Sequence, residues 1–110
     1  MKDNKLYVSH ILDSLNQIES YCSDGKNSFF QSRLIQDAVI RNLEIIGEAT
    51  KQLSGEFRKK HDHIPWREMA GLRDILIHDY FGVDLRTVWG VIEKELPKLK
   101  KQVQKIIIEW

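Results

Sequence analysis

Residues 85–110 read LRTVWGVIEKELPKLKKQVQKIIIEW, and apolar side chains recur there at alternating spacings of four and three. This spacing places them on one stripe of an α-helix, in the pattern of a heptad seam. The seam consists of Leu85, Trp89, Ile92, Leu96, Leu99, Val103, Ile106 and Trp110. Asp84 has the residue type of an N-cap, and Pro97 lacks a backbone donor. The stretch therefore predicts a long last helix that begins after Asp84 and kinks near Pro97.

Two more helices with apolar faces are expected upstream of this segment. In residues 7–22 an apolar residue recurs at spacings of three and four, which predicts a first helix closed by an Asp-Gly pair. Ser28 and Gln31 have the spacing of a capping box, and from there to Leu53 apolar residues cover most of the helical circumference. A second helix of that composition is expected to be buried on more than one side.

The polar side chains of this second helix form a narrow line. They are Asp37, Arg41, Glu44 and Glu48, at i, i+4, i+7 and i+11, and they share one angular strip at about 100° per residue. The strip is interpreted either as a solvated stripe with local ion pairs or as the lining of a polar cleft.

The remaining segment, residues 54–82, divides at Pro65. The Ser-Gly pair at its start ends the second helix, and the basic residues that follow predict a connector with one short helical turn. Pro65 suits the first turn of a third main helix that ends near Gly82, which is available as a left-handed cap. No stretch shows the alternating pattern of a strand. The expected fold class is all-α, a four-helix up-down bundle with a short extra helical turn in the connector, in one domain over residues 1–110.

Composition narrows the classes of function. A chain of 110 residues with 42% hydrophobic and 30% charged residues fits one compact domain. No apolar run approaches the roughly 18 residues of a membrane-spanning helix, and the N-terminus lacks the order of a secretory signal, so a cytoplasmic protein without membrane contact is expected. The single cysteine, Cys22, continues the apolar stripe of the first helix and is interpreted as a core residue. Lys and Arg number 17 against 16 Asp and Glu, so a site for a polyanion has to be local.

The sequence lacks the common motifs for cofactors and metals. It has no Gly-rich phosphate loop, no G-x-S-x-G elbow and no Cys-x-x-Cys pair. The nearest metal-like cluster, His61-x-His63, lies in the basic connector without a helical i, i+4 partner, whereas structural zinc normally requires four ligands. We therefore expect neither a metal site nor a cofactor.

The third main helix ends in a cluster of ionisable and hydroxyl groups. Arg73, Asp74, His78 and Tyr80 lie within the otherwise apolar stretch GLRDILIHDYFG. An arginine fork matches phosphate oxygens, and a histidine moves protons near neutral pH. Together they are the parts needed to cleave RNA without a metal, by attack of the ribose 2'-hydroxyl on its own phosphate. From the residues alone, a histidine at the core edge beside a surface ion pair remains the alternative.

The spacing of Arg73 and His78 complicates a shared site. Positions five apart diverge by about 140° on an unbroken helix. The two side chains can meet if the helix unwinds near His78, if both reach into one cleft from its rim, or if a second subunit completes the site.

Several blocks of the sequence resemble one family. The run R-D-x-x-x-H-x-Y at 73–80 resembles the R-x4-H-x-Y motif of the HEPN superfamily. More closely, the chain resembles the HepT-like family in DAVIRNLEIIGEA at 37–49, IPW at 64–66, GLR at 71–73 and HDYFGVD at 78–84. The blocks occur in the family's order, and the resemblance spans roughly residues 6–105.

The resemblance implies a small all-helical ribonuclease toxin that acts on RNA as a homodimer, with two motifs facing a shared cleft. By position, Arg73 and His78 match the catalytic pair, and Tyr80 matches a tyrosine that receives AMP in some systems. Asp74 occupies the polar position after the arginine, where Asn is frequent in the family, and adds a negative charge near the scissile phosphate.

The resemblance also implies a partner. Family members are typically encoded beside a minimal nucleotidyltransferase antitoxin, which binds the toxin and in some systems transfers AMP from ATP to the motif tyrosine. Arg41 and Glu44 of the polar strip are expected to support the dimer cleft. The expected function is therefore a metal-independent endoribonuclease toxin neutralised by a nucleotidyltransferase.

Two other interpretations keep the same fold and much of the motif. The domain could bind RNA or a nucleotide without cutting it, or it could serve as the accessory subunit of a nucleotidyltransferase. Cleavage of purified RNA in EDTA separates the ribonuclease from both.

Overall fold

The chain is almost entirely helical in the part that the structure describes, which is residues 3–78 and 84–110, with the backbone alone for 73–78. In this computed structural model no β-strand occurs among the described residues. The long helical runs are α1 (Asn4–Tyr21), α3 (Arg33–Gln52), α5 (Trp66–His78), and the continuous run of α6 (Leu85–Gly90), the π-helical turn η2 (Val91–Glu95) and α7 (Leu96–Ile108). The short helices are α2 (Lys26–Gln31) and α4 (Gly55–Lys60). The predicted all-α class is confirmed.

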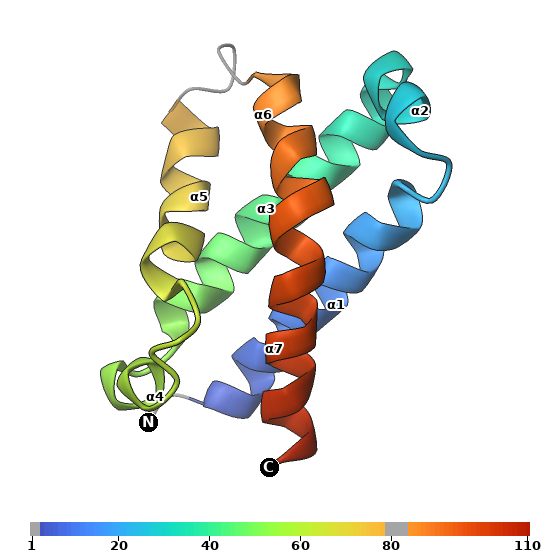
Figure 1. Cartoon of the computed structure of the whole chain (residues 1–110). Helices are drawn as coiled ribbons and strands as arrows, with labels where there is room; N and C mark the ends of the chain where they lie inside the picture. The colour runs from blue at the N-terminus through green and yellow to red at the C-terminus, as the bar shows by residue number, and fades with distance from the viewer. Residues whose placement is uncertain (1–2, 79–83) are drawn as a thin grey trace.

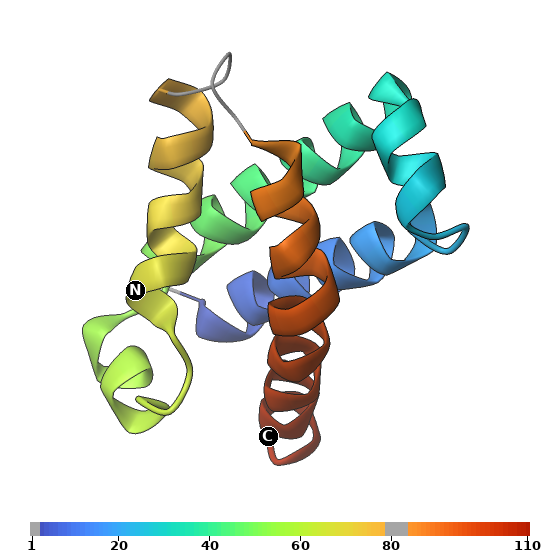
Figure 2. The same ribbon diagram turned by 45° about the horizontal axis from the view of Figure 1, so that its top comes forward.

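The long runs alternate in direction along the bundle. Figure 1 shows α1 and α3 as an oblique antiparallel pair, crossed by a second antiparallel pair made of α5 and the α6–α7 run. The turned view in Figure 2 shows the same two pairs. Helix α3 packs against both α1 and α5, and α7 packs against α1. This is the up-down arrangement expected from the sequence.

The apolar stripes predicted for the first and last helices face the core. The buried residues of the α1 stripe are Val8, Ile11, Leu15 and Ile18. Those of the last seam are Ile92, Leu96, Leu99, Val103 and Ile106. Trp110, at the end of the seam, is 47% exposed. None of the described helices is both long and apolar enough to cross a lipid bilayer. Because α3 packs between two neighbours, its predicted burial on more than one side is confirmed.

The predicted start of the second helix at Ser28 is wrong. The helix is interrupted at Ser32, which lies between α2 and α3. Ser32 has an extended backbone, and its hydroxyl accepts a hydrogen bond at 3.2 Å from a backbone N–H in the first turn of α3. The side-chain amide of Gln36 donates to the carbonyl oxygens of Phe29 and Phe30 at 2.9 and 3.2 Å. Ser32 is therefore the N-cap of α3, and Gln36 satisfies carbonyls at the end of α2.

The helical turn predicted in the basic connector is α4, and it fixes the start of α5. The Ser54 hydroxyl caps α4 by accepting from the N–H of Phe57 at 3.1 Å. Ser54 also exchanges hydrogen bonds of 3.0 and 3.2 Å with Asn4 at the start of α1. The indole N–H of Trp66 donates to the carbonyl of His61 at 2.9 Å. These bonds tie the start of α5 to the connector, and the connector to α1.

The interruption expected at Pro97 takes the form of a π-helical turn just before the proline. In η2 the N–H of Leu96 bonds the carbonyl of Val91, five residues back. Pro97 then lies in the first turn of α7, directly after the π-turn, and because it has no N–H it donates no bond to the preceding turn of the run. The apolar seam continues through this turn, because Ile92 of η2 and Leu96 and Leu99 of α7 are all buried.

Candidate active site

The R-x4-H motif lies on the C-terminal half of α5. The N-terminal half is anchored by Trp66 and Met69, which are buried in the core. The helix then continues through Arg73 and Asp74 to His78. A rigid first half therefore carries the motif toward the end of the bundle where α6 begins (Figure 1).

The backbone of α5 remains α-helical between Arg73 and His78. The two positions therefore lie about 7.5 Å apart along the axis and about 140° apart around it. Of the three ways to bring the side chains together, unwinding near His78 is not found between Arg73 and His78, and residues 79–83 lie outside the described part of the chain. A common cleft reached from its rim and a second copy of the chain remain. Tyr80 and the expected cap Gly82 lie outside the described residues.

The polar strip of α3 borders a hollow of about 370 Å³ between α1 and α3. Arg41 and Glu44 line it, and the Nη1 and Oε2 atoms of this pair lie 3.5 Å apart. Glu48 lines the hollow as well, whereas the Asp37 carboxylate lies 3.8 Å from the guanidinium of Arg33. The strip thus carries local ion pairs, and three of its four residues also line a hollow whose walls are partly polar and partly apolar.

Two residues of α1 also line this hollow, although the sequence pattern gives them no role in a site. They are Tyr7 and His10, whose rings meet edge to face with centroids 5.9 Å apart. Their i, i+3 spacing places them on one face of the helix. That this face lies beside Arg41 and Glu44 follows from the packing of α1 against α3, which the spacing does not show. All described residues that line the hollow belong to these two helices.

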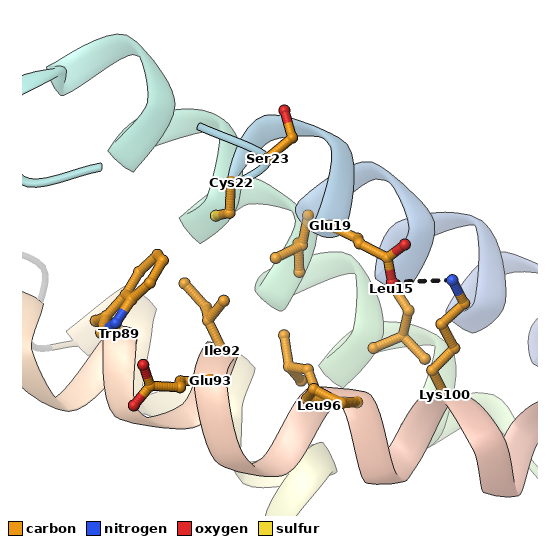
Figure 3. A pocket seen from close by; sticks show the side chains of 11 residues that line it. Leu15, Glu19, Cys22, Ser23, Trp89, Ile92, Glu93, Leu96 and Lys100 are labelled. Atoms are coloured by element: carbon orange, nitrogen blue, oxygen red, sulfur yellow. Dashed lines mark hydrogen bonds and ion pairs between the residues drawn. The ribbon is translucent and has the colours of Figure 1, made fainter. Parts of the chain in front are cut away.

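A second hollow, of about 310 Å³, lies between the C-terminal half of α1 and the α6–α7 run (Figure 3). Apolar side chains such as Leu15 and Leu96 line it, and an ion pair of 2.9 Å between Glu19 and Lys100 closes one side. Cys22 also faces this space, and burial raises the pKa of its thiol. A thiol that stays protonated at neutral pH is a weak nucleophile, so this hollow offers no catalytic group of that kind.

The two histidines of the connector lie near one another, with ring centroids 6.2 Å apart. Burial, Lys60 and His63 lower the pKa of His61, and Glu109 opposes the shift. Among the residues that the structure describes, no group of three or more His, Cys, Asp or Glu side chains could hold a metal ion.

The chain is similar to proteins of one family. The model of a family described as ribonuclease HepT-like matches residues 11–106. A Methanocaldococcus jannaschii protein, named as a gamma-glutamylcyclotransferase and candidate RNase, is 55% identical over 98% of this chain and 49% of its own length. A candidate RNase of Caldanaerobacter subterraneus subsp. tengcongensis is 46% identical over 97% of this chain and 96% of its own length. The "Probable ribonuclease HepT" of Thermococcus cleftensis is 42% identical over 96% of each chain.

These similarities extend over nearly all of the sequence. The chain spans about half the length of the first relative and nearly the whole length of the other two. No solved structure matches it. The region matched by the family model includes α5 with Arg73 and His78, and most of the helices that pack around it. This protein therefore belongs to the HepT-like ribonuclease family.

Proposed function

We propose that this protein is a metal-independent endoribonuclease that acts in the cytoplasm. The observation that carries the proposal is the match to a ribonuclease family over a region that contains Arg73 and His78 on one helix. Those two residue types supply a proton-transfer group and a fixed cation, which are sufficient for RNA cleavage by its own 2'-hydroxyl.

The proposed reaction needs no external nucleophile. His78 takes the proton of the 2'-hydroxyl or delivers one to the departing 5'-oxygen, and Arg73 stabilises the crowded anionic phosphorus. The bond from the 2'-oxygen to phosphorus forms as the bond from phosphorus to the 5'-oxygen breaks. The products are a 2',3'-cyclic phosphate and a 5'-hydroxyl.

Cleavage of purified RNA in excess EDTA tests this function against the two alternatives. The parent protein should cut RNA at an unchanged rate when divalent cations are removed. A module that only binds RNA, or an accessory subunit of a nucleotidyltransferase, would leave the RNA intact. Loss of cleavage on chelation would contradict the metal-independent mechanism.

We also propose that the active form is a homodimer. Since α5 is regular up to His78, the two positions lie about 140° apart around one helix, and a two-fold partner would place a second motif across the same cleft. Apolar surface is available for such a contact, because Leu34 at the start of α3 is 81% exposed. Arg41 and Glu44 of the hollow between α1 and α3 are proposed as supporting residues of the dimer cleft.

Light scattering, which measures the molar mass in solution, tests whether the protein is a dimer. We expect a mass of twice 13.0 kDa at micromolar concentration. A monomer that retains full cleavage activity at the same concentration would contradict a shared site.

Control by a nucleotidyltransferase antitoxin completes the proposal. The partner would bind this ribonuclease toxin and transfer AMP from ATP to Tyr80, two residues beyond His78. The support is the order of sequence blocks around Tyr80, which matches the family in which such pairs occur.

A further inference from the structure

Four lysines form a straight line along the outer face of the last helical run. They are Lys94 in η2 and Lys98, Lys101 and Lys105 in α7, at spacings of four, three and four, and all four are exposed. At 100° per residue the three lysines of α7 lie within about 60° of one another, and Lys94 precedes them by one turn in η2. The buried seam lies on the opposite side of the helix, so this lysine stripe faces away from the core.

The lysine stripe is not neutralised by the residues around it. None of its four ammonium groups makes an ion pair or a side-chain hydrogen bond with another described residue, whereas Lys100, off the stripe, pairs with Glu19 at 2.9 Å. Three carboxylates lie nearby in the sequence: Glu93 and Glu95 flank Lys94, and Glu109 follows Lys105 by four residues. Like charges at i, i+3 and i+4 destabilise a helix. Since none of these carboxylates forms an ion pair with the stripe, an anionic partner would relieve the repulsion among the four lysines.

The spacing of the lysine stripe suits an extended chain of phosphates. Its members follow one another at about 5.5 Å along the axis, and together they span about 16 Å. Such a series of point charges can follow the backbone of a single strand, because ammonium groups bind phosphates without requiring a fixed geometry.

A groove beside the lysine stripe connects it to the helix that carries the motif. This groove, of about 510 Å³, lies between α5 and the η2–α7 segment and includes Lys98. Its floor contains Met69 and Leu72 of α5, and Leu72 directly precedes Arg73 in the sequence. Glu68 and Glu95 also line it, and Lys98 is the one member of the lysine stripe among the described lining residues, so the stripe runs along the α7 side of the groove and not through it.

We infer that the lysine stripe binds the phosphate backbone of single-stranded RNA, with nucleotides beside the groove between α5 and α7. This inference rests on the proposed ribonuclease function and extends it, because it assigns a binding track outside the motif. The track would hold substrate nucleotides that are not themselves cut, and so would raise affinity for long strands over short ones.

The test compares two triple variants that lower the net charge equally. Lys98, Lys101 and Lys105 are changed to Gln in the first variant, and the exposed Lys26, Lys59 and Lys60 are changed to Gln in the second. Each set is placed in a His78→Ala background, and binding of a labelled single-stranded RNA 12-mer is titrated over a range of salt concentrations. Thermal unfolding monitored by circular dichroism confirms that both variants are folded.

The stripe variant should bind the 12-mer at least tenfold more weakly at about 0.1 M salt, while the control variant changes little. A single strand contributes about 0.7 to the slope of log K against log salt per phosphate contact, so the slope should fall by about 2. In the cleaving parent background, the stripe variant should lose kcat/KM for long RNA but keep it for a dinucleotide.

Equal effects of the two variants on affinity and on salt slope would overturn the inference. So would the absence of RNA binding by the parent, or stripe-dependent binding of polyglutamate without binding of RNA, which would instead assign the lysine stripe to an acidic protein. If the parent fails to cut RNA but shows the stripe-dependent slope, the proposed catalytic function is wrong while the binding track stands.

Discussion

His78→Ala should slow RNA cleavage by about 100- to 10,000-fold, because a positioned acid-base group contributes that much to proton transfer. Arg73→Ala should cause a loss of similar size, since it removes the cation that stabilises the phosphorus in the transition state. Arg73→Lys keeps the charge but loses the planar fork, so we expect only partial activity. Initial rates on a fluorogenic RNA measure all three variants.

A matched variant shows whether these losses are specific to the motif. Arg67→Ala removes an exposed arginine from the same helix, α5. It should cut RNA near the parent rate. If His78→Ala cleaves as fast as Arg67→Ala, the assignment of His78 to proton transfer is wrong.

Adenylylation of Tyr80 should abolish cleavage without unfolding the protein. The added phosphodiester carries a negative charge and considerable bulk two residues from His78, so it would repel the RNA phosphate and fill the cleft. The protein is incubated with its cognate nucleotidyltransferase, ATP and magnesium. Intact mass and peptide mapping then locate the modification, and RNA cleavage is measured on the same sample.

The controls for this prediction are two phenylalanine variants. Tyr80→Phe should not be modified, whereas Tyr21→Phe, which changes a 40% exposed tyrosine of α1, should be modified as the parent is. Adenylylation that persists in Tyr80→Phe would refute the assignment. Modified protein that cuts RNA at the original rate would refute the inhibitory role.

Much of the fold could be predicted because it depends on local periodicity. The stripe from Val8 to Ile18 and the seam from Ile92 to Ile106 both face the core as their spacing indicates. The interruption of the helix at Ser32 could not be predicted from the sequence, because it depends on a contact outside the local pattern of apolar residues. Ser28 and Ser32 are equally suitable capping residues by type, and the bond from Gln36 back to Phe29 distinguishes them.

Only part of the candidate site could be predicted from the sequence. The motif on α5 follows from residue types, and the backbone is a regular helix between Arg73 and His78. The neighbours Tyr7 and His10 of the α3 polar strip could not be assigned, because the pairing of α1 with α3 is a tertiary property. The lysine stripe is visible as a spacing, but its lack of compensating partners requires the folded structure.

The ends of the RNA fragments released in EDTA test the central claim most directly. Attack by the 2'-hydroxyl at Arg73 and His78 predicts fragments that end in a 2',3'-cyclic phosphate, paired with fragments that begin with a 5'-hydroxyl. Mass spectrometry of a single defined oligonucleotide, cut by the parent and by His78→Ala, distinguishes these termini. The account predicts cyclic phosphate ends from the parent and almost none from the variant. Fragments with a 3'-hydroxyl and a 5'-phosphate would show that water attacks instead and would contradict it.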